Sequence, residues 1–159
     1  MATDPDCTCE GVDAGQCIGL SIPSRMELLT VLDGLVTAIA AHMDFGEEAT
    51  IELATSIIEA GTNAIQHGHD HDQSKMVSFR FFIGERALEV WVTDQGQGFD
   101  VASVLSADPT RPEDLLKSRG RGIFIMRAMM DSVEFEVVPG RGTVVHLVKT
   151  RRGGNGSKP

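Results

Sequence analysis

Three glycine-containing segments constrain the fold of this chain more than any other feature, because each lies in a different structural pattern. Residues 59–63 (Glu-Ala-Gly-Thr-Asn) lie within a helical pattern, residues 94–98 (Asp-Gln-Gly-Gln-Gly) follow a strand pattern, and residues 120–122 (Gly-Arg-Gly) precede a second helical pattern. Glycine-rich turns are common, so each segment alone is a weak signal. Their order is specific, and it predicts a fold that brings a helix face, a strand end and a helix start to one site.

The first segment belongs to a predicted helix from Glu48 to Gln66. Its apolar residues recur at intervals of three and four and form one stripe, namely Ile51, Ala54, Ile58, Gly61 and Ile65, widened by Leu53, Ile57, Ala60 and Ala64. Glu59 and Asn63 share a narrow polar strip beside it, with His67 one turn further. Partial desolvation there makes a carboxylate a better base, and an amide oxygen suits Mg²⁺ that carries phosphate oxygens. An isolated pair of this kind more often marks a solvated helix face, and the other two segments reverse that interpretation.

The second segment follows a predicted strand over residues 87–93. Its period of two places four residues on one face: Leu88, Val90, Val92 and Asp94. A buried acid at the end of this strand can accept a hydrogen bond from an exocyclic amine such as that of adenine. Gly96 and Gly98 let the backbone pass close to a flat ring. The alternative is an ordinary turn between a strand and a loop.

The third segment opens a predicted helix that runs to about Met130, with Ile123 and Met126 on its inner stripe. Gly120 and Gly122 bracket its start. Exposed N–H groups and the positive end of a helix dipole favour anions there, and glycines let phosphate oxygens approach closely. Three cations add positive charge beside it: Lys117, Arg119 and Arg121. The spacing is neither that of a P-loop nor that of a dinucleotide-binding fingerprint.

Length and charge narrow the class of protein. The 159 residues suit one domain, expected over residues 17–149 between disordered tails at 1–15 and 150–159. The chain has no apolar run near the roughly 20 residues of a membrane-spanning helix and no secretion signal, so a cytoplasmic protein without membrane contact is expected. A net charge of −9 argues against nucleic-acid binding and favours a protein partner.

Two clusters of potential metal ligands lie outside the three segments. Three cysteines precede the first predicted helix (Cys7, Cys9 and Cys17), and we expect an inert tail rather than a disulfide framework or a metal clip. Three histidines alternate with acids after the first segment (His67, His69 and His71). There we expect a solvated polar loop, the alternative being a surface site for a transition metal.

The remaining pattern predicts an α+β fold. A strand over 18–22 precedes a capping box at Ser24–Glu27 and a helix with the apolar stripe Leu28, Leu32, Leu35, Ile39 and Met43. Strands at 76–83 and 86–93 form a hairpin, residues 101–118 read as a lid-like loop, and strands at 132–138 and 143–149 follow the helix at 121–130. This succession predicts a two-layer α/β sandwich, in which helices cover one face of a mainly antiparallel sheet.

The other face of the predicted sheet is mixed in character. It alternates Met76, Arg80, Phe82, Glu89 and Trp91. Such a face could serve a protein partner or a second copy of the chain, although scattered exposed apolar residues are also common.

With these segments in place, the chain resembles the Bergerat-fold (GHKL, histidine-kinase-like) ATPases, and within them the anti-sigma-factor serine/threonine kinases. The resemblance covers about residues 17–149. Residues 59–67 resemble the N box of the family, 94–99 its first glycine box, 120–126 its second, and 140–143 its last, shorter motif.

The resemblance implies specific roles. Glu59 is the general base, Asn63 a ligand of Mg²⁺ held with ATP, and Asp94 the partner of adenine, whose end of the site Thr143 supports. Gly120 and Gly122 lie against the phosphates. The other implied nucleotide-binding residues are His67, Gly96, Gly98, Phe99, Arg119, Arg121 and Ile123. Implied partners are an anti-sigma-factor antagonist of the STAS type and a sigma factor, with the kinase a homodimer.

One position departs from the family pattern. Anti-sigma kinases often carry an arginine two residues before the glycine that matches Gly120, where it reaches the γ-phosphate, and this chain has Ser118. Lys117, Arg119 and Arg121 are the candidates to supply that cation. The departure keeps open a binding module that sequesters partners in a nucleotide-dependent way without transferring phosphate. A stand-alone ATP domain of a two-component system is the other alternative.

Overall fold

The computed structural model describes residues 16–106, 111 and 118–152 of the chain. The predicted N-terminal tail, the end of the C-terminal tail and most of the predicted lid lie outside these residues, as do Cys7 and Cys9. Cys17 is half-buried and forms no disulfide with a described residue. Among the described helices, none has the length and apolar character needed to cross a bilayer.

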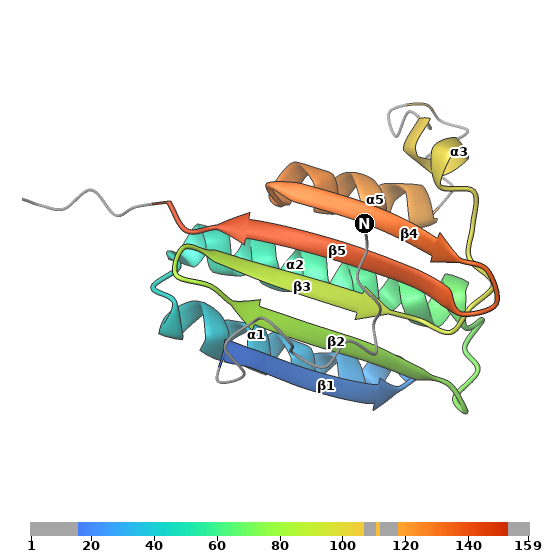
Figure 1. Cartoon of the computed structure of the whole chain (residues 1–159), viewed down its shortest axis with the longest axis horizontal. Coiled ribbons are helices and arrows are strands. Elements are labelled where there is room, and N and C mark those ends of the chain that lie inside the picture. The colour runs from blue at the N-terminus through green and yellow to red at the C-terminus, as the bar shows by residue number, and fades with distance from the viewer. Residues whose placement is uncertain (1–15, 107–110, 112–117, 153–159) are drawn as a thin grey trace, which may run out of the picture.

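Five strands form one sheet (Figure 1). They are β1 (Cys17–Pro23), β2 (Met76–Ile83), β3 (Ala87–Thr93), β4 (Ser132–Val138) and β5 (Gly142–Thr150), in the spatial order β1-β2-β3-β5-β4. Every neighbouring pair is antiparallel. The predicted antiparallel sheet is confirmed, and β5 continues one residue beyond the predicted domain boundary at 149.

Helices cover one face of this sheet, as predicted (Figure 1). They are α1 (Leu29–His42), preceded by the short turn η2 (Met26–Leu28), α2 (Glu47–Asn63), extended by the wide π-type turn η3 (Ala64–Gly68), and α5 (Ser118–Met129). A fourth, short helix, α3 (Val101–Ser106), occupies the start of the segment predicted as a loop. The structure is therefore the two-layer α/β sandwich expected from the sequence.

The period-two patterns predicted the inner face of the sheet correctly. Val77, Phe79 and Phe81 of β2 and Leu88, Val90 and Val92 of β3 are each at most 1% exposed. These side chains pack against α1 and α2 and make the centre of the core. Because β3 keeps this alternation to its end, Asp94 emerges on the inner side, beneath the helices.

The predicted stripe on α2 was wrong at its first turn. Ile51 is 57% exposed, whereas Leu53, Ile57 and Ala60 are fully buried. The buried face therefore centres on the residues that were expected only to widen the stripe. Apolar spacing alone does not show which side of α2 the rest of the fold covers, and the side on which Ile51 lies is left exposed.

The predicted capping box at Ser24–Glu27 was also wrong. The N-cap of η2 is Arg25, and no side chain caps the helix start. Glu27 instead accepts a hydrogen bond from Arg25 Nε at the surface, while the buried Ser24 hydroxyl lies 3.1 Å from Nδ1 of His69. A tertiary partner for Ser24 thus replaced the local one that the sequence pattern predicted.

A buried lysine of β5 links the first half of α2 to the end of α5. Lys149 of β5 points inward, and its ammonium donates to Glu52 Oε2 of α2 and to the carbonyl of Met129, each at 2.5 Å. Met129 is the last residue of α5, so the cation also faces the negative end of that helix. This contact fixes the far end of the two helices whose opposite ends carry the predicted site.

Replacing Lys149 with methionine is expected to destabilise the fold by about 3 kcal/mol, because it leaves the Glu52 carboxylate and the Met129 carbonyl without their donor. Urea unfolding measures this effect. The double variant Lys149→Met/Glu52→Gln should recover part of the loss, since no uncompensated charge remains. Arg152→Met, at an exposed position, is the matched control. A loss no larger than that of the control would show that the ion pair contributes little.

Candidate functional site

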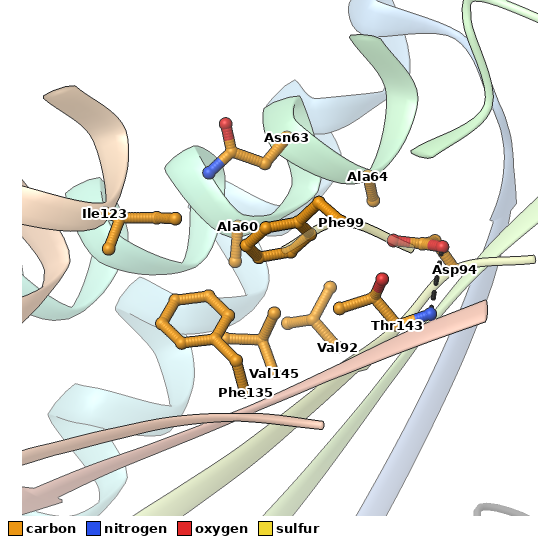
Figure 2. Close-up of a pocket in the computed structure, with 10 residues that line it drawn as sticks. All are labelled: Ala60, Asn63, Ala64, Val92, Asp94, Phe99, Ile123, Phe135, Thr143 and Val145. Atoms are coloured by element: carbon orange, nitrogen blue, oxygen red, sulfur yellow. Dashed lines mark hydrogen bonds between the residues drawn. The ribbon is translucent and has the colours of Figure 1, made fainter. Parts of the chain in front are cut away.

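Residues of the first two predicted segments line one pocket between the sheet and the helices, together with Ile123, which directly follows the third segment (Figure 2). Every layer of the fold contributes to its wall. The lining residues are Ala60, Asn63 and Ala64 of α2 and η3, Val92, Asp94 and Phe99 from β3 and the loop after it, Ile123 of α5, Phe135 of β4, and Thr143 and Val145 of β5. The pocket is apolar on most sides, and Asp94 and Asn63 supply polar groups at two of its edges.

Asp94 is held in place by the backbone. It is only 7% exposed, and its Oδ1 accepts hydrogen bonds from the N–H groups of Gly96 (2.8 Å) and Thr143 (3.2 Å). The N–H of Asp94 in turn donates to the carbonyl of Thr143 at 3.0 Å. Oδ2 has no hydrogen-bond partner among the residues that the structure describes. A fixed, buried carboxylate therefore keeps one oxygen able to accept from a ligand amine.

Glu59 and Asn63 lie where α5 comes closest to α2. Both side chains are half-buried. A Cβ added to Gly122 would lie 2.7 Å from Glu59 Oε2 and 3.3 Å from Asn63 Nδ2, so a side chain there would displace the Glu59 carboxylate. The structure thus places the third segment directly beside the predicted base and the predicted metal ligand.

The donor set around Asn63 suits a cation that arrives with phosphate. Within the described ranges, no three His, Cys, Asp or Glu side chains gather in a way that could hold a metal ion by themselves. Asn63 offers one neutral amide oxygen, which is a good but single ligand for Mg²⁺. The remaining ligands would have to be phosphate oxygens and water, which is the usual way that Mg²⁺ binds at nucleotide sites.

Phe99 lies across the pocket. Its ring packs edge-to-face on Phe135, with centroids 6.0 Å apart, and Figure 2 shows it among the other lining side chains. The remaining free volume is about 10 Å³, which is room for about one water molecule. A purine ring is much larger than this free volume, so lining side chains such as Phe99 have to move before a flat ligand can reach Asp94.

The glycines of the third segment lie inside α5 rather than ahead of it. The helix starts at Ser118, two residues before Gly120, which corrects the predicted start at 121. Among the described residues, the N–H groups of the first turn that have no partner within the helix therefore belong to residues 118–120. Gly120 lines a separate groove with Val104, Leu105 and Phe124, and Arg121 is exposed.

The other predicted nucleotide-binding residues are spread around the pocket. His67 is exposed at the end of η3. Gly98 has φ +79° and lies against Val137 of β4, so it turns the chain toward Phe99. Arg119 belongs to the first turn of α5, and its side chain lies outside the part of the molecule that the structure describes.

The expected solvated histidine loop was wrong for His69. Its side chain is 2% exposed, and Nε2 accepts a hydrogen bond from the backbone N–H of Gln95 at 2.8 Å. His71, in contrast, is exposed, with φ +59°. Alternation of His with Asp suggested a polar surface, and no local signal showed that the η3 turn rotates His69 inward.

Sequence reasoning missed the hydrophobic wall of the pocket. Val145 pairs with both Val92 and Phe135 in adjacent strands, so the three side chains form one row across the inner face. The strands had been predicted with nearly correct bounds. Their inward positions could have been found by extending the period-two argument from β3 to β4 and β5.

Comparison with known proteins agrees with this geometry. Residues 22–149 match the family model described as the histidine kinase-like ATPase domain. Serine-protein kinase RsbW of Bacillus licheniformis is 31% identical over 131 residues, which cover 80% of this chain and 82% of the relative. RsbW of Bacillus velezensis is 30% identical over 86% of each chain. An anti-sigma F factor of Thermoanaerobacter is 32% identical over 72% of this chain and 80% of the relative.

The family match spans most of the chain, and the alignments cover most of each relative as well. The resemblance inferred from the sequence is thereby confirmed. The chain belongs to the histidine kinase-like ATPase family, in the branch of the anti-sigma-factor serine kinases.

Proposed function

We propose that this protein is an ATP-dependent serine/threonine kinase that acts as an anti-sigma factor in the cytoplasm and phosphorylates an anti-sigma-factor antagonist of the STAS type. The observation that carries the proposal is the contact of Gly122 with Glu59 and Asn63. It brings a helix start suited to phosphate against a carboxylate suited to take a proton. The names of the relatives, serine-protein kinase and anti-sigma factor, support the same activity.

The adenine end of the nucleotide lies at Asp94 in this proposal. Oδ2 accepts from the exocyclic amine, while Oδ1 stays bound to Gly96 and Thr143. Phe99 turns outward to admit the ring, and Val92 and Val145 pack against its faces. Guanine carries a carbonyl where adenine carries the amine, so the same carboxylate disfavours GTP.

The phosphates then extend toward the start of α5. The hydroxyl of a serine or threonine on the antagonist attacks the γ-phosphorus, its proton passes to Glu59, and the bond to the β–γ bridging oxygen breaks to release ADP. Asn63 would hold a Mg²⁺ ion that arrives with the phosphates, and such an ion would supply positive charge to offset that of the transferred group. Arg119 in the first turn of α5 is our first candidate for the cation that Ser118 does not supply.

A phosphotransfer assay tests this function. The purified protein is incubated with γ-labelled Mg-ATP and a single-domain antagonist encoded beside it, and label is expected on a serine or threonine of the antagonist. Affinity for the sigma factor is measured in parallel with ATP, with ADP and without nucleotide, and is expected to differ among them. Nucleotide-dependent binding without transfer would identify a sequestering module instead. Equal binding in all three states and no transfer would contradict both functions.

We also propose that the protein is a homodimer formed through the outer face of the sheet. Trp91 lies at its centre, stacked on His146 at 3.9 Å and meeting the edge of Phe82 at 4.7 Å. Arg80 is the register neighbour of Trp91 on the β1 side, and Glu134 is the neighbour of His146 on the β4 side. A two-fold rotation about this aromatic centre brings the basic side of one copy onto the acidic side of the other.

Replacing Trp91 with glutamate is expected to convert the dimer to a monomer, because it removes the central aromatic contact and adds a charge to it. Sedimentation velocity measures the change. Ile51→Glu, at a more exposed apolar site on α2, is the control and should leave the dimer intact. Dimers that persist in Trp91→Glu and dissociate in Ile51→Glu would move the interface to the helical side.

A further inference from the structure

His69 connects three parts of the fold that no motif joins. It follows η3 and is 2% exposed. Its Nε2 lies 2.8 Å from the backbone nitrogen of Gln95, in the loop after β3, and its Nδ1 lies 3.1 Å from Ser24 Oγ, where β1 leads into η2. The imidazole therefore links the end of the α2–η3 helix by a hydrogen bond to Gln95, the residue that directly follows Asp94.

The contacts of His69 determine its protonation state. A backbone N–H can only donate, so the N–H of Gln95 requires a lone pair on Nε2. The single proton of the neutral ring then lies on Nδ1 and is donated to Ser24 Oγ. A second proton would place two donors face to face at 2.8 Å. Protonation of His69 is thus incompatible with its bond to Gln95.

The loop after β3, to which His69 is hydrogen-bonded, also carries Asp94. Its backbone is in direct contact with that of η3. A Cβ on Gly68 would lie 2.7 Å from the carboxyl carbon of Asp94, and a Cβ on Gly96 would lie 2.2 Å from the carbonyl oxygen of Gly68. The backbone segments at Gly68 and Gly96 therefore pack directly on each other, with no side chain between them. The hydrogen bond from the Gln95 N–H to His69 Nε2 holds these two backbone segments together. Because Gln95 directly follows Asp94, a change in the protonation of His69 alters the position of the Asp94 carboxylate.

We infer that neutral His69 is a positioning residue for the adenine carboxylate: it holds the Asp94 loop in its binding conformation and releases it on protonation. His69 does not touch the nucleotide and takes no part in phosphoryl transfer. Its effect is on the affinity for any adenine nucleotide. The inference rests on the proposed role of Asp94 in binding adenine.

The sign of the pH dependence follows from burial. Burial lowers the pKa of His69 below its ordinary value of 6.5, and the Asp94 carboxylate opposes part of this shift. From the turn before β2, Asp72 raises the pKa of His69 and Lys75 lowers it. Beside Ser24, Arg25 and Glu27 pair with each other at the surface. The neutral form therefore predominates above pH 6.5. The hydrogen bond to Gln95, and the affinity that depends on it, are lost as the pH falls below 6.5 through the lowered pKa of His69.

The test compares His69 with glutamine at that position. In His69→Gln, the side-chain oxygen can accept from the Gln95 N–H and carries no ionisable proton. The dissociation constant of Mg-ATP is measured by calorimetry from about pH 8 to about pH 5. The wild-type affinity should fall relative to that of His69→Gln by up to about tenfold per pH unit in the acid range, and the two should be similar near pH 8. Any pH dependence that the two proteins share, including that of ATP itself, cancels in the ratio.

Controls separate this inference from the proposed site. His42→Gln, at an exposed position on α1, should keep the wild-type pH profile. A ratio that stays constant across the pH range would overturn the positioning role. If Asp94→Asn binds Mg-ATP normally, the site assignment itself fails, which is a distinct result. Should His69→Gln not fold, nitrogen NMR of the wild-type protein decides: the inference requires His69 with its proton on Nδ1 at neutral pH, and a proton on Nε2 would contradict it.

Discussion

Replacing Asp94 with asparagine is expected to weaken ATP binding by about a hundredfold or more while the fold remains intact. The asparagine oxygen can still accept from the N–H groups of Gly96 and Thr143, which hold Oδ1 in the wild type. Its amide nitrogen replaces Oδ2 and presents a donor to the donor of adenine. The buried ligand amine therefore loses its acceptor and meets a like group, and calorimetry with Mg-ATP measures the loss.

Circular dichroism and urea unfolding of the same variant establish that the fold persists. The wild-type protein should also prefer ATP to GTP, because the carboxylate that accepts from the adenine amine faces a carbonyl in guanine. Asp100→Asn, at an exposed position beyond the pocket, is the matched control. Equal affinity of the wild type for ATP and GTP, or normal ATP binding by Asp94→Asn, would remove Asp94 from this role.

Replacing Glu59 with glutamine is expected to slow phosphoryl transfer by about 10²- to 10⁴-fold, with little change in the affinity for Mg-ATP. Glutamine keeps the size of the side chain beside Gly122 but cannot take the proton of the attacking hydroxyl. A base acts in the transition state, whereas nucleotide contacts come from other residues. Single-turnover transfer to the antagonist gives the rate, and calorimetry gives the affinity.

Glu48→Gln, on the exposed side of the first turn of α2, is the matched control and should transfer at the wild-type rate. If the affinity of Glu59→Gln for Mg-ATP fell as far as its transfer rate, Glu59 would be a binding residue and the base would have to be sought elsewhere. A transfer rate unchanged by the substitution would exclude Glu59 from proton transfer altogether.

The fold could be predicted from the sequence because local periodicity and tertiary burial agree in its strands. Leu88, Val90 and Val92 alternate strictly, and all three are buried in the structure. That alternation alone placed Asp94 beneath the helices. The same agreement holds along most of α1, where Leu32, Ile39 and Met43 of the predicted stripe are buried.

The prediction failed where a tertiary partner outweighed a local pattern. Ser24 matched a capping box, but its hydroxyl bonds to His69, which lies 45 residues away along the chain. His69 in turn looked like part of a polar loop, and only the wide turn of η3 brings it inward. Neither contact has a signal in the nearby sequence. The two errors are the two ends of one long-range contact.

In the candidate site, too, local spacing predicted some features and tertiary packing determined the others. Glu59, Asn63 and Gly122 were identified by spacing, and the structure brings them together. The packing of the pocket was not predictable in the same way, because the position of Phe99 depends on Phe135, a residue of another strand. Residue types thus indicated the chemistry of the site, whereas its shape depends on how distant strands pair.

The central claim is that the three glycine-containing segments form one ATP site, with adenine at Asp94 and the γ-phosphate beside Glu59. A crystal structure with a non-hydrolysable Mg-ATP analogue tests it most directly. We expect the exocyclic amine within hydrogen-bond distance of Asp94 Oδ2, Phe99 turned out of the pocket, and the γ-phosphate between Gly122 and Glu59. A nucleotide bound elsewhere, for example on the aromatic outer face at Trp91, or bound with its phosphates directed away from α5, would contradict the account.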